Sequence, residues 1–204
     1  MNTMHSRFSQ KGFTLIETLV AIFILALTIG ALLTLTAGGF FSIRYAKNDI
    51  VAANLLQESL EYIRNDRDTA YQDGTITWSQ WRDVYRAQGC YDSDGCIINP
   101  YTNTGTPISA CTTMTTSEGL RVPCEPLSYY SDAAMYGYES TGKIFTTTVT
   151  PITTSFIRVI RFTDITTPAG DPQLKITARM DWKNGTNPKS TEQSIILTPW
   201  NLPQ

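Results

Sequence analysis

Few side chains in this sequence could carry out acid–base, nucleophilic or metal chemistry. The single histidine of the 204 residues, His5, precedes a long apolar segment. Ser–His–Asp and Cys–His arrangements need a histidine beside the nucleophile, and the sequence contains no glycine-rich phosphate-binding loop. We therefore predict that the protein is not an enzyme. The alternative is a signal-anchored extracytoplasmic enzyme that uses carboxylates alone.

The four cysteines lie together in a stretch with no regular apolar pattern: Cys90, Cys96, Cys111 and Cys124. An even number of cysteines in an exported domain is typical of disulfides. Four cysteines allow three pairings, and proximity along the chain favours Cys90–Cys96 with Cys111–Cys124. A zinc site is the alternative, but the spacings differ from those of paired Cys-x-x-Cys knuckles, so we predict no metal here.

A short acidic segment, Asp92-Ser93-Asp94-Gly95, contains ligands of the type that calcium prefers. The EF-hand pattern continues over about twelve residues, with glycine at the sixth position and glutamate at the twelfth. That pattern is absent, so we interpret the segment as a turn. We predict no cofactor, with calcium in the folded domain as the alternative.

A long apolar segment precedes the cysteines and the acidic segment in the sequence. Between residues 13 and 36 the only charged side chain is Glu17. A helix of this length can span a hydrocarbon core of about 30 Å, whereas the apolar region of a secretory signal peptide has about 7–15 residues. The sequence therefore predicts a membrane-spanning helix, and a plain signal anchor is the alternative.

The helical pattern continues beyond the apolar segment, to about residue 68. Apolar residues recur there every three or four positions, which predicts one buried helical stripe. The stripe comprises Ile43, Ala46, Ile50, Ala53, Leu56, Leu60 and Ile63. We expect a single helix over residues 13–68, membrane-spanning in its first half and amphipathic in residues 37–68.

The C-terminal part of the sequence reads as strands. Residues 143–150, 156–163, 173–182 and 191–198 are rich in β-branched and aromatic side chains. Asn184-Gly185 between the last two is a strong turn signal. Consecutive strands with short connections favour an antiparallel meander, so we predict an α+β fold in which the long helix packs on a C-terminal sheet over residues 143–204.

The region between helix and sheet, residues 69–142, is the least regular. Residues 77–84 predict a short helix, and the rest is rich in threonine, serine, glycine and tyrosine. Four of its tyrosines could bind a ligand or cover the edge of the core, and we favour the second role. They are Tyr91, Tyr129, Tyr130 and Tyr136. The net charge of −2 gives no indication of nucleic-acid binding.

The apolar segment begins with Lys11-Gly12-Phe13-Thr14-Leu15-Ile16-Glu17, followed by an unbroken apolar run. This start resembles the cleavage and methylation motif of type IV prepilins and type II secretion pseudopilins. The resemblance implies that a prepilin peptidase cuts between Gly12 and Phe13, removing residues 1–12 as a leader, and that the new N-terminal Phe13 is methylated. A carboxylate within a membrane span costs about 2.5–3.5 kcal/mol without a partner. The resemblance implies that the partner of Glu17 is the N-terminal amine of a neighbouring subunit.

The same resemblance implies partners and a location. The partners would be other pilin or pseudopilin subunits, the prepilin peptidase and an assembly platform in the inner membrane. The chain would cross the inner (cytoplasmic) membrane once, with its folded domain outside the cytoplasm, before it enters a pilus or pseudopilus. Residues 52–64 and 177–182 are similar to minor subunits of the I type, which favours a minor subunit. A pilus-tip adhesin or ligand-binding minor pilin is the alternative.

Overall fold

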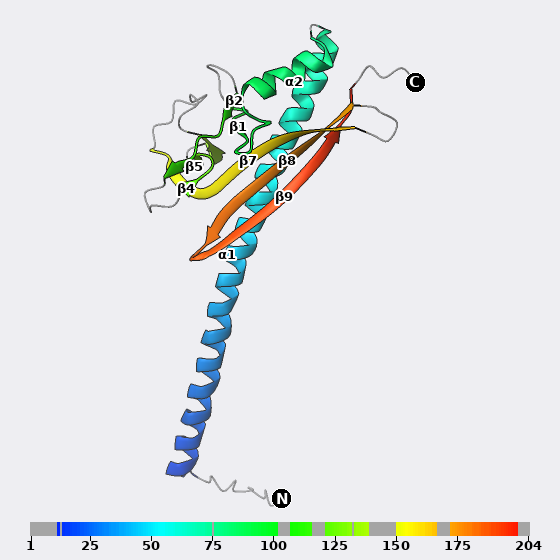
Figure 1. Ribbon diagram of the computed structural model, residues 1–204. Helices are drawn as coiled ribbons and strands as arrows, with labels where there is room; N and C mark the ends of the chain where they lie inside the picture. Colours follow the sequence, from blue (N-terminus) through cyan, green and yellow to red (C-terminus); the bar gives the residue numbers. More distant parts are fainter. Residues whose placement is uncertain are drawn as a thin grey trace, which may run out of the picture. The chain divides into compact units, whose positions relative to one another are not determined.

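A computed structural model describes residues 12, 14–74, 76–101, 107–115, 121–131, 133–138, 150–166 and 172–199. The chain divides into two compact units, Met1–Lys47 and Asn48–Gln204. We call the second unit the head. Helix α1 (Leu15–Asp73) begins in the first unit and ends in the head, and all other elements belong to the head (Figure 1). The predicted leader apart from Gly12 lies outside the described residues, and so does the strand predicted over residues 143–150, apart from Thr150.

Helix α1 is longer than the sequence pattern predicted. It comprises 59 residues without interruption and continues through Gly30, Gly38 and Gly39. The predicted end at residue 68 is wrong by five residues, because the helix continues through the charged segment to Asp73 with half-buried and exposed side chains. Gly74 follows the helix with a φ of +59°, the left-handed conformation that commonly ends a helix and that glycine adopts without strain.

The buried face of α1 is shorter than the predicted stripe and is rotated from it. Leu56, Leu60 and Ile63 are buried as expected, whereas Ile43 and Ile50 are more than 60% exposed. The buried residues of the helix include three that are off the stripe, one of them a serine: Ala52, Leu55, Leu56, Ser59, Leu60 and Ile63. The Ser59 hydroxyl donates to the Leu56 carbonyl at 2.7 Å, which satisfies its hydrogen bond inside the core.

A second helix, α2 (Trp78–Ala87), lies where the sequence predicted one. Thr77 begins it with a capping box, in which Thr77 and Gln80 each bond the main chain of the other. Its buried Trp81 and Tyr85 both donate to one carboxylate oxygen of Asp66 on α1, at 2.7 and 2.8 Å. This shared acceptor joins α2 to the last turns of α1.

Three long strands form the antiparallel meander that the sequence predicted. They are β7 (Ile152–Thr166), β8 (Pro172–Asn184) and β9 (Asn187–Leu197). Strand β8 alternates buried and exposed residues, as a half-buried strand does. The β8–β9 hairpin turns through two residues, Gly185 and Thr186, and Gly185 has a φ of +64°.

The sheet also contains four short strands from the region expected to be irregular. They are β1 (Cys96–Ile98), β2 (Ile108–Ala110), β5 (Pro126–Tyr130) and β6 (Met135–Gly137). Strands β1 and β5 pair with the side of β7 opposite β8, and β2 and β6 pair with β1 and β5 respectively. A separate pair, β3 (Met114–Thr115) and β4 (Arg121–Val122), completes the head. The sheet is therefore not confined to residues 143–204. The sequence did not reveal these strands because runs of three to five residues are too short to show a sequence period.

Candidate assembly and processing site

The polar residues at the start of α1 cap its first turn. Thr14 precedes the helix, and its hydroxyl and carbonyl oxygens both lie within hydrogen-bonding distance of the Glu17 N–H, at 3.4 and 3.1 Å. Thr14 is therefore the N-cap and Glu17 the third helical residue, the spacing of a capping box. A carboxylate in the first turn also interacts favourably with the helix dipole. The sequence analysis did not anticipate this local role of Glu17.

Glu17 differs from the other polar side chains of the apolar half of α1. Four threonine hydroxyls each donate to a main-chain carbonyl of the preceding turn at 2.8 Å: Thr18, Thr28, Thr34 and Thr36. These bonds satisfy the hydroxyls inside hydrocarbon without a second chain. In the described part of the chain, the Glu17 carboxylate has neither a hydrogen bond nor an ion pair. Glu17 thus remains available to a cation outside its own helix.

The apolar half of α1 has the composition of a membrane anchor. Its leucine, isoleucine and phenylalanine side chains are exposed, with Leu15 at 81% and Phe23 at 62%. Its most apolar 18-residue window has a mean hydropathy of 2.6 and no buried residue. So much exposed apolar surface requires a non-aqueous surrounding, and the segment is long enough to cross a bilayer.

Gly12 is exposed just before α1, and no heavy atom lies within 4 Å of the position that a Cβ would take there. Phe13 lies outside the described residues. The order glycine, phenylalanine, threonine cap and helix thus places the expected cleavage site immediately before a capped helix.

Residues 7–33 match the family described as the prokaryotic N-terminal methylation motif. No curated protein and no solved structure matches the chain. The matched residues contain Gly12, Phe13 and Glu17, and the long helix followed by an antiparallel sheet is the architecture of pilins. The chain carries a prepilin-type N-terminal methylation motif on a membrane-anchoring helix and has a pilin-like α+β architecture. Both features are consistent with a type IV pilin-like protein or pseudopilin.

All four cysteines form disulfides, in the two pairs that proximity favoured. Cys90 bonds Cys96 and Cys111 bonds Cys124, each with 4.6 Å between the Cα atoms. The first loop packs against β7, where the Phe162 N–H donates to the Cys90 carbonyl at 2.9 Å. The Cys111 N–H donates to the Gly95 carbonyl at 2.9 Å, which holds the two disulfide loops together. These bonds attach an irregular region to the sheet.

The acidic segment in the first disulfide loop forms a turn, as predicted. The Gly95 N–H donates to the Asp92 carbonyl at 3.1 Å, and Gly95 has a φ of +76°. A Cβ at Gly95 would lie 2.5 Å from the Ile160 carbonyl oxygen, so the turn approaches β7 closely. Within the described residues, no three His, Cys, Asp or Glu side chains are grouped closely enough to hold a metal ion.

The tyrosines of the variable region lie at the edge of the core, as favoured above. Tyr130 is 8% exposed, and Tyr129 packs on Tyr136 with 5.1 Å between the ring centroids. Tyr136 in turn meets Phe156 edge to face. Tyr91 packs between Phe162 and the Arg86 guanidinium, which is 4.4 Å from its ring centroid.

Two charged groups of the head were missed by the sequence analysis, and the first is Arg158 on β7. Arg158 is 2% exposed and donates to the main-chain carbonyls of Leu55 on α1 and Ile98 on β1, at 2.8 and 2.7 Å. Its counter-ion is Glu58, at 3.2 Å. Burial and a hydrogen bond to Glu58 raise the pKa of Tyr101 to about 12. The signal was a lone charge within the apolar run Phe156-Ile157-Arg158-Val159-Ile160, because a buried charge needs a partner.

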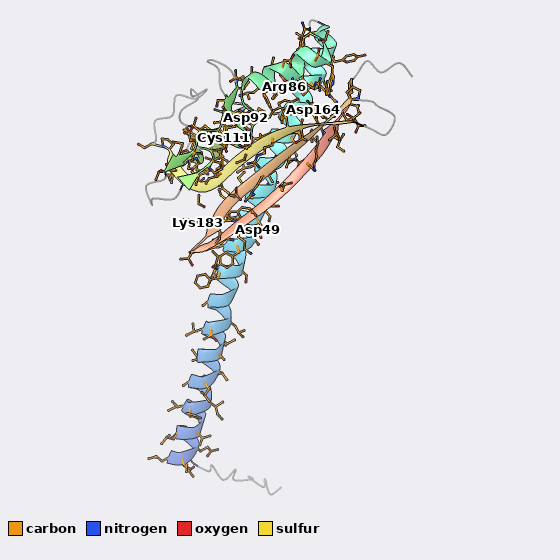
Figure 2. All side chains as sticks on the ribbon, viewed as in Figure 1. Asp49, Arg86, Asp92, Cys111, Asp164 and Lys183 are labelled. Carbon is orange, nitrogen blue, oxygen red and sulfur yellow. A yellow bond between two sulfur atoms is a disulfide. The ribbon has the colours of Figure 1, made fainter. Side chains whose placement is uncertain are left out.

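The second group surrounds Asp164 near the end of β7. Arg82 and Arg86 of α2 each bond one oxygen of this carboxylate, at 2.8 and 2.9 Å. Arg86 on the helix and Asp164 on the strand are labelled close together in Figure 2. The pKa of Tyr91 is raised to about 12 by burial and by the Asp164 carboxylate, against the opposing effect of the two arginines. This cluster fixes α2 to the sheet.

Proposed function

We propose that the protein is a minor subunit of a type IV pilus or a type II secretion pseudopilus. The Glu17 carboxylate carries this proposal, because it has no partner among the described residues, whereas the neighbouring threonine hydroxyls bond their own helix. A charge that is costly in hydrocarbon is explained if it pairs with the N-terminal amine of Phe13 in a neighbouring subunit. The subunit then works through assembly, without catalysis and without a cofactor.

The maturation that we propose begins with a prepilin peptidase, which cuts between Gly12 and Phe13. Methylation of the Phe13 amine follows. The apolar half of α1 anchors the subunit in the inner membrane, with the head outside the cytoplasm, where an oxidising environment forms the two disulfides. An assembly platform then transfers the subunit to the filament.

The position of the cut can be tested directly. Co-expression with a prepilin peptidase should yield a chain whose first residue is Phe13, measured by mass spectrometry of the N-terminal peptide. Gly12→Ala should lower cleavage, because the added Cβ would crowd the peptidase, whereas Gly30→Ala within the helix should leave it unchanged. An ordinary signal peptide would instead be cut after the apolar segment, at the small residues around Ala37. A mature N-terminus there would refute the proposal.

The assembly role of Glu17 has a separate test. Glu17→Ala should leave insertion and cleavage intact but reduce the share of the protein found in sheared filaments, with Glu17→Gln intermediate. An unpaired amine in hydrocarbon costs about 3 kcal/mol, so we expect roughly a hundredfold loss of incorporation. The matched control is Thr18→Val, because the Thr18 hydroxyl bonds its own helix. Normal assembly of Glu17→Ala would contradict the proposed pairing, unless the subunit occupies the filament tip.

A tip position is the second candidate, favoured by the size of the disulfide-bonded region between α1 and β7. A subunit at the tip has no neighbour above it, so it tolerates loss of the Glu17 carboxylate. Immunogold labelling of filaments distinguishes the two positions, since a tip subunit labels only the ends.

A further inference from the structure

Strand β9 forms an edge of the sheet (Figure 1). Among the described residues it pairs only with β8, over all 11 of its residues. The closing pair of a two-residue hairpin exchanges both main-chain hydrogen bonds, and here that pair is Asn184 with Asn187. Every second residue from Asn187 onward therefore bonds β8, and the residues between them direct their N–H and C=O groups away from the sheet.

A contact on the other side of β8 supports this alternation. The Lys183 N–H reaches the Ser155 hydroxyl of β7 at 3.4 Å, so the odd-numbered residues of β8 face β7 and the even-numbered residues face β9. The outward-facing residues of β9 are consequently the even-numbered ones: Pro188, Ser190, Glu192, Ser194 and Ile196. Pro188 has no N–H to leave unpaired, but the other four each present a donor and an acceptor.

The protection that natural sheets give to exposed strands is confined here mainly to the start of β9. Short length, bulges, prolines and charged side chains, lysine above all, usually prevent pairing with another chain. The β8–β9 register contains no bulge, Pro188 and Lys189 lie at the second and third residues of the strand, and Glu192 is the only charged residue from Ser190 onward. The stretch from Ser190 to Leu197 is left as a continuous template for a further strand.

A groove of about 300 Å³ runs beside this edge. It is lined by Gln57, Leu60, Glu61 and Arg64 from α1 and by Gln193, Ser194 and Ile195 from β9. Gln193 and Ile195 are paired with the buried Ala178 and Ile176 of β8, so their side chains lie on the face of the sheet that meets α1. A strand added to β9 would direct every second side chain into this groove, over Leu60 and Ile195.

The opposite face of the edge also indicates what the added strand should carry. Glu192 is exposed and has no ion pair within the described residues, and Ile196, four residues on, is 58% exposed. Residues directly opposite each other in an antiparallel pair interact most strongly. A basic residue opposite Glu192 and an apolar residue opposite Ile196 would complement both.

We propose that the free edge of β9 binds an extended strand from a different subunit of the same filament. The strand adds antiparallel to residues 190–197, with a basic side chain opposite Glu192, an apolar side chain opposite Ile196, and alternate side chains in the groove. This inference rests on the proposed role as a filament subunit.

A second copy of this chain fits the edge poorly. The other described edges of the sheet, β2 and β6, have three residues each, too few to cover β9. Pairing of β9 with β9 of a second copy requires a two-fold axis, whereas successive subunits of a filament are related head to tail. Since no described segment of this chain covers the edge and a second copy fits it poorly, the exposed main-chain groups favour a strand from another protein.

Photo-crosslinking of the full-length chain, in cells that contain its assembly machinery, tests the proposal. Benzoylphenylalanine replaces Ser194, or, as a control, Thr177, its partner in the interior strand β8. We expect an adduct from position 194 alone, mapped by mass spectrometry to an extended segment of another filament subunit. An adduct with a second copy of this chain, equal adducts from both positions, or none from position 194 would overturn the proposal.

A proline variant distinguishes strand addition from mere proximity. Ser190→Pro removes one outward N–H without removing a bond to β8, and Pro188 shows that β9 accepts proline at an outward position. One lost hydrogen bond with its local distortion corresponds to roughly a tenfold lower adduct yield, whereas Ser190→Ala should leave the yield unchanged. Glu192→Lys keeps every main-chain group and should also lower the yield. Adducts insensitive to both Ser190→Pro and Glu192→Lys would refute strand addition.

The N-terminal mass of the same protein separates this inference from the proposed function. A chain that begins at Phe13 and enters filaments, but gives no adduct at position 194, would leave the filament role intact and overturn the docking edge. A chain with another N-terminus that still gives a proline-sensitive adduct with a different membrane protein would refute the filament role and leave strand addition at β9 intact.

Discussion

Removal of one member of the buried Arg158–Glu58 ion pair should destabilise the head to an extent that depends on which member is removed. The Arg158 side chain is 2% exposed and the Glu58 side chain 25%. Glu58→Gln leaves a guanidinium in the core without a counter-charge, whereas Arg158→Met leaves a carboxylate that still reaches water. Glu58→Gln should therefore be the more destabilising of the two.

The magnitudes follow from the contacts of each side chain. Loss of one partner of a buried pair costs about 3–5 kcal/mol, and Glu58→Gln belongs at about 3 kcal/mol because Arg158 keeps its bonds to two carbonyl oxygens. Arg158→Met loses those two bonds but retains apolar packing, which we put at about 2 kcal/mol. The double variant leaves neither charge, so it should cost about 2 kcal/mol, well below the sum of the single variants.

Thermal unfolding of the full-length chain in detergent measures these differences. The near-ultraviolet circular dichroism signal of the buried aromatic side chains monitors the unfolding. For a domain of roughly 150 residues, 1 kcal/mol lowers the Tm by about 2–4 °C. Glu58→Gln should thus lower it by about 6–12 °C. The matched control is Glu61→Gln, which breaks only the exposed pair with Arg64 and should cost less than about 1 kcal/mol. An Arg158→Met variant less stable than Glu58→Gln, or additive single effects, would refute the reasoning.

Two further predictions concern the turn at Gly95 and the pH dependence of the head. Gly95→Asn should lower the free energy of unfolding by about 1–3 kcal/mol, because the new Cβ would meet the Ile160 carbonyl; Gly185→Asn, at a similar φ but in open space, should change it by less than about 0.5 kcal/mol. Equal effects in urea titrations would argue against the close approach. The pKa values of Tyr91 and Tyr101 are raised from 10.0 to about 12, so their stabilising contribution is complete below pH 10 and is lost as the pH rises to 12. Absorbance titration near 295 nm should show these two tyrosines ionising above pH 10, and ionisation at the ordinary tyrosine pKa in the folded head would contradict this assignment.

The amino-acid sequence by itself determined the features that depend on near neighbours along the chain. The apolar run with its single charge at Glu17 specifies a membrane-anchoring helix, because length and composition decide insertion. Asn184-Gly185 specifies a tight hairpin, because glycine adopts the required positive φ without strain. The cysteines paired as proximity favoured, because loops of 6 and 13 residues close readily.

Only the tertiary structure decided which surfaces of these elements are covered. The buried face of α1 includes Leu55 and Ser59 instead of Ile43 and Ile50, because the sheet contacts only part of the helix. The buried Arg158 of β7 links α1 and β1 by hydrogen bonds to partners 60 and 103 residues away in sequence. The short strands beside β7 likewise follow from pairing between distant segments, as does the edge position of β9 among the described strands. A local sequence pattern cannot encode such pairing, since the strand register is set by contacts across the sheet.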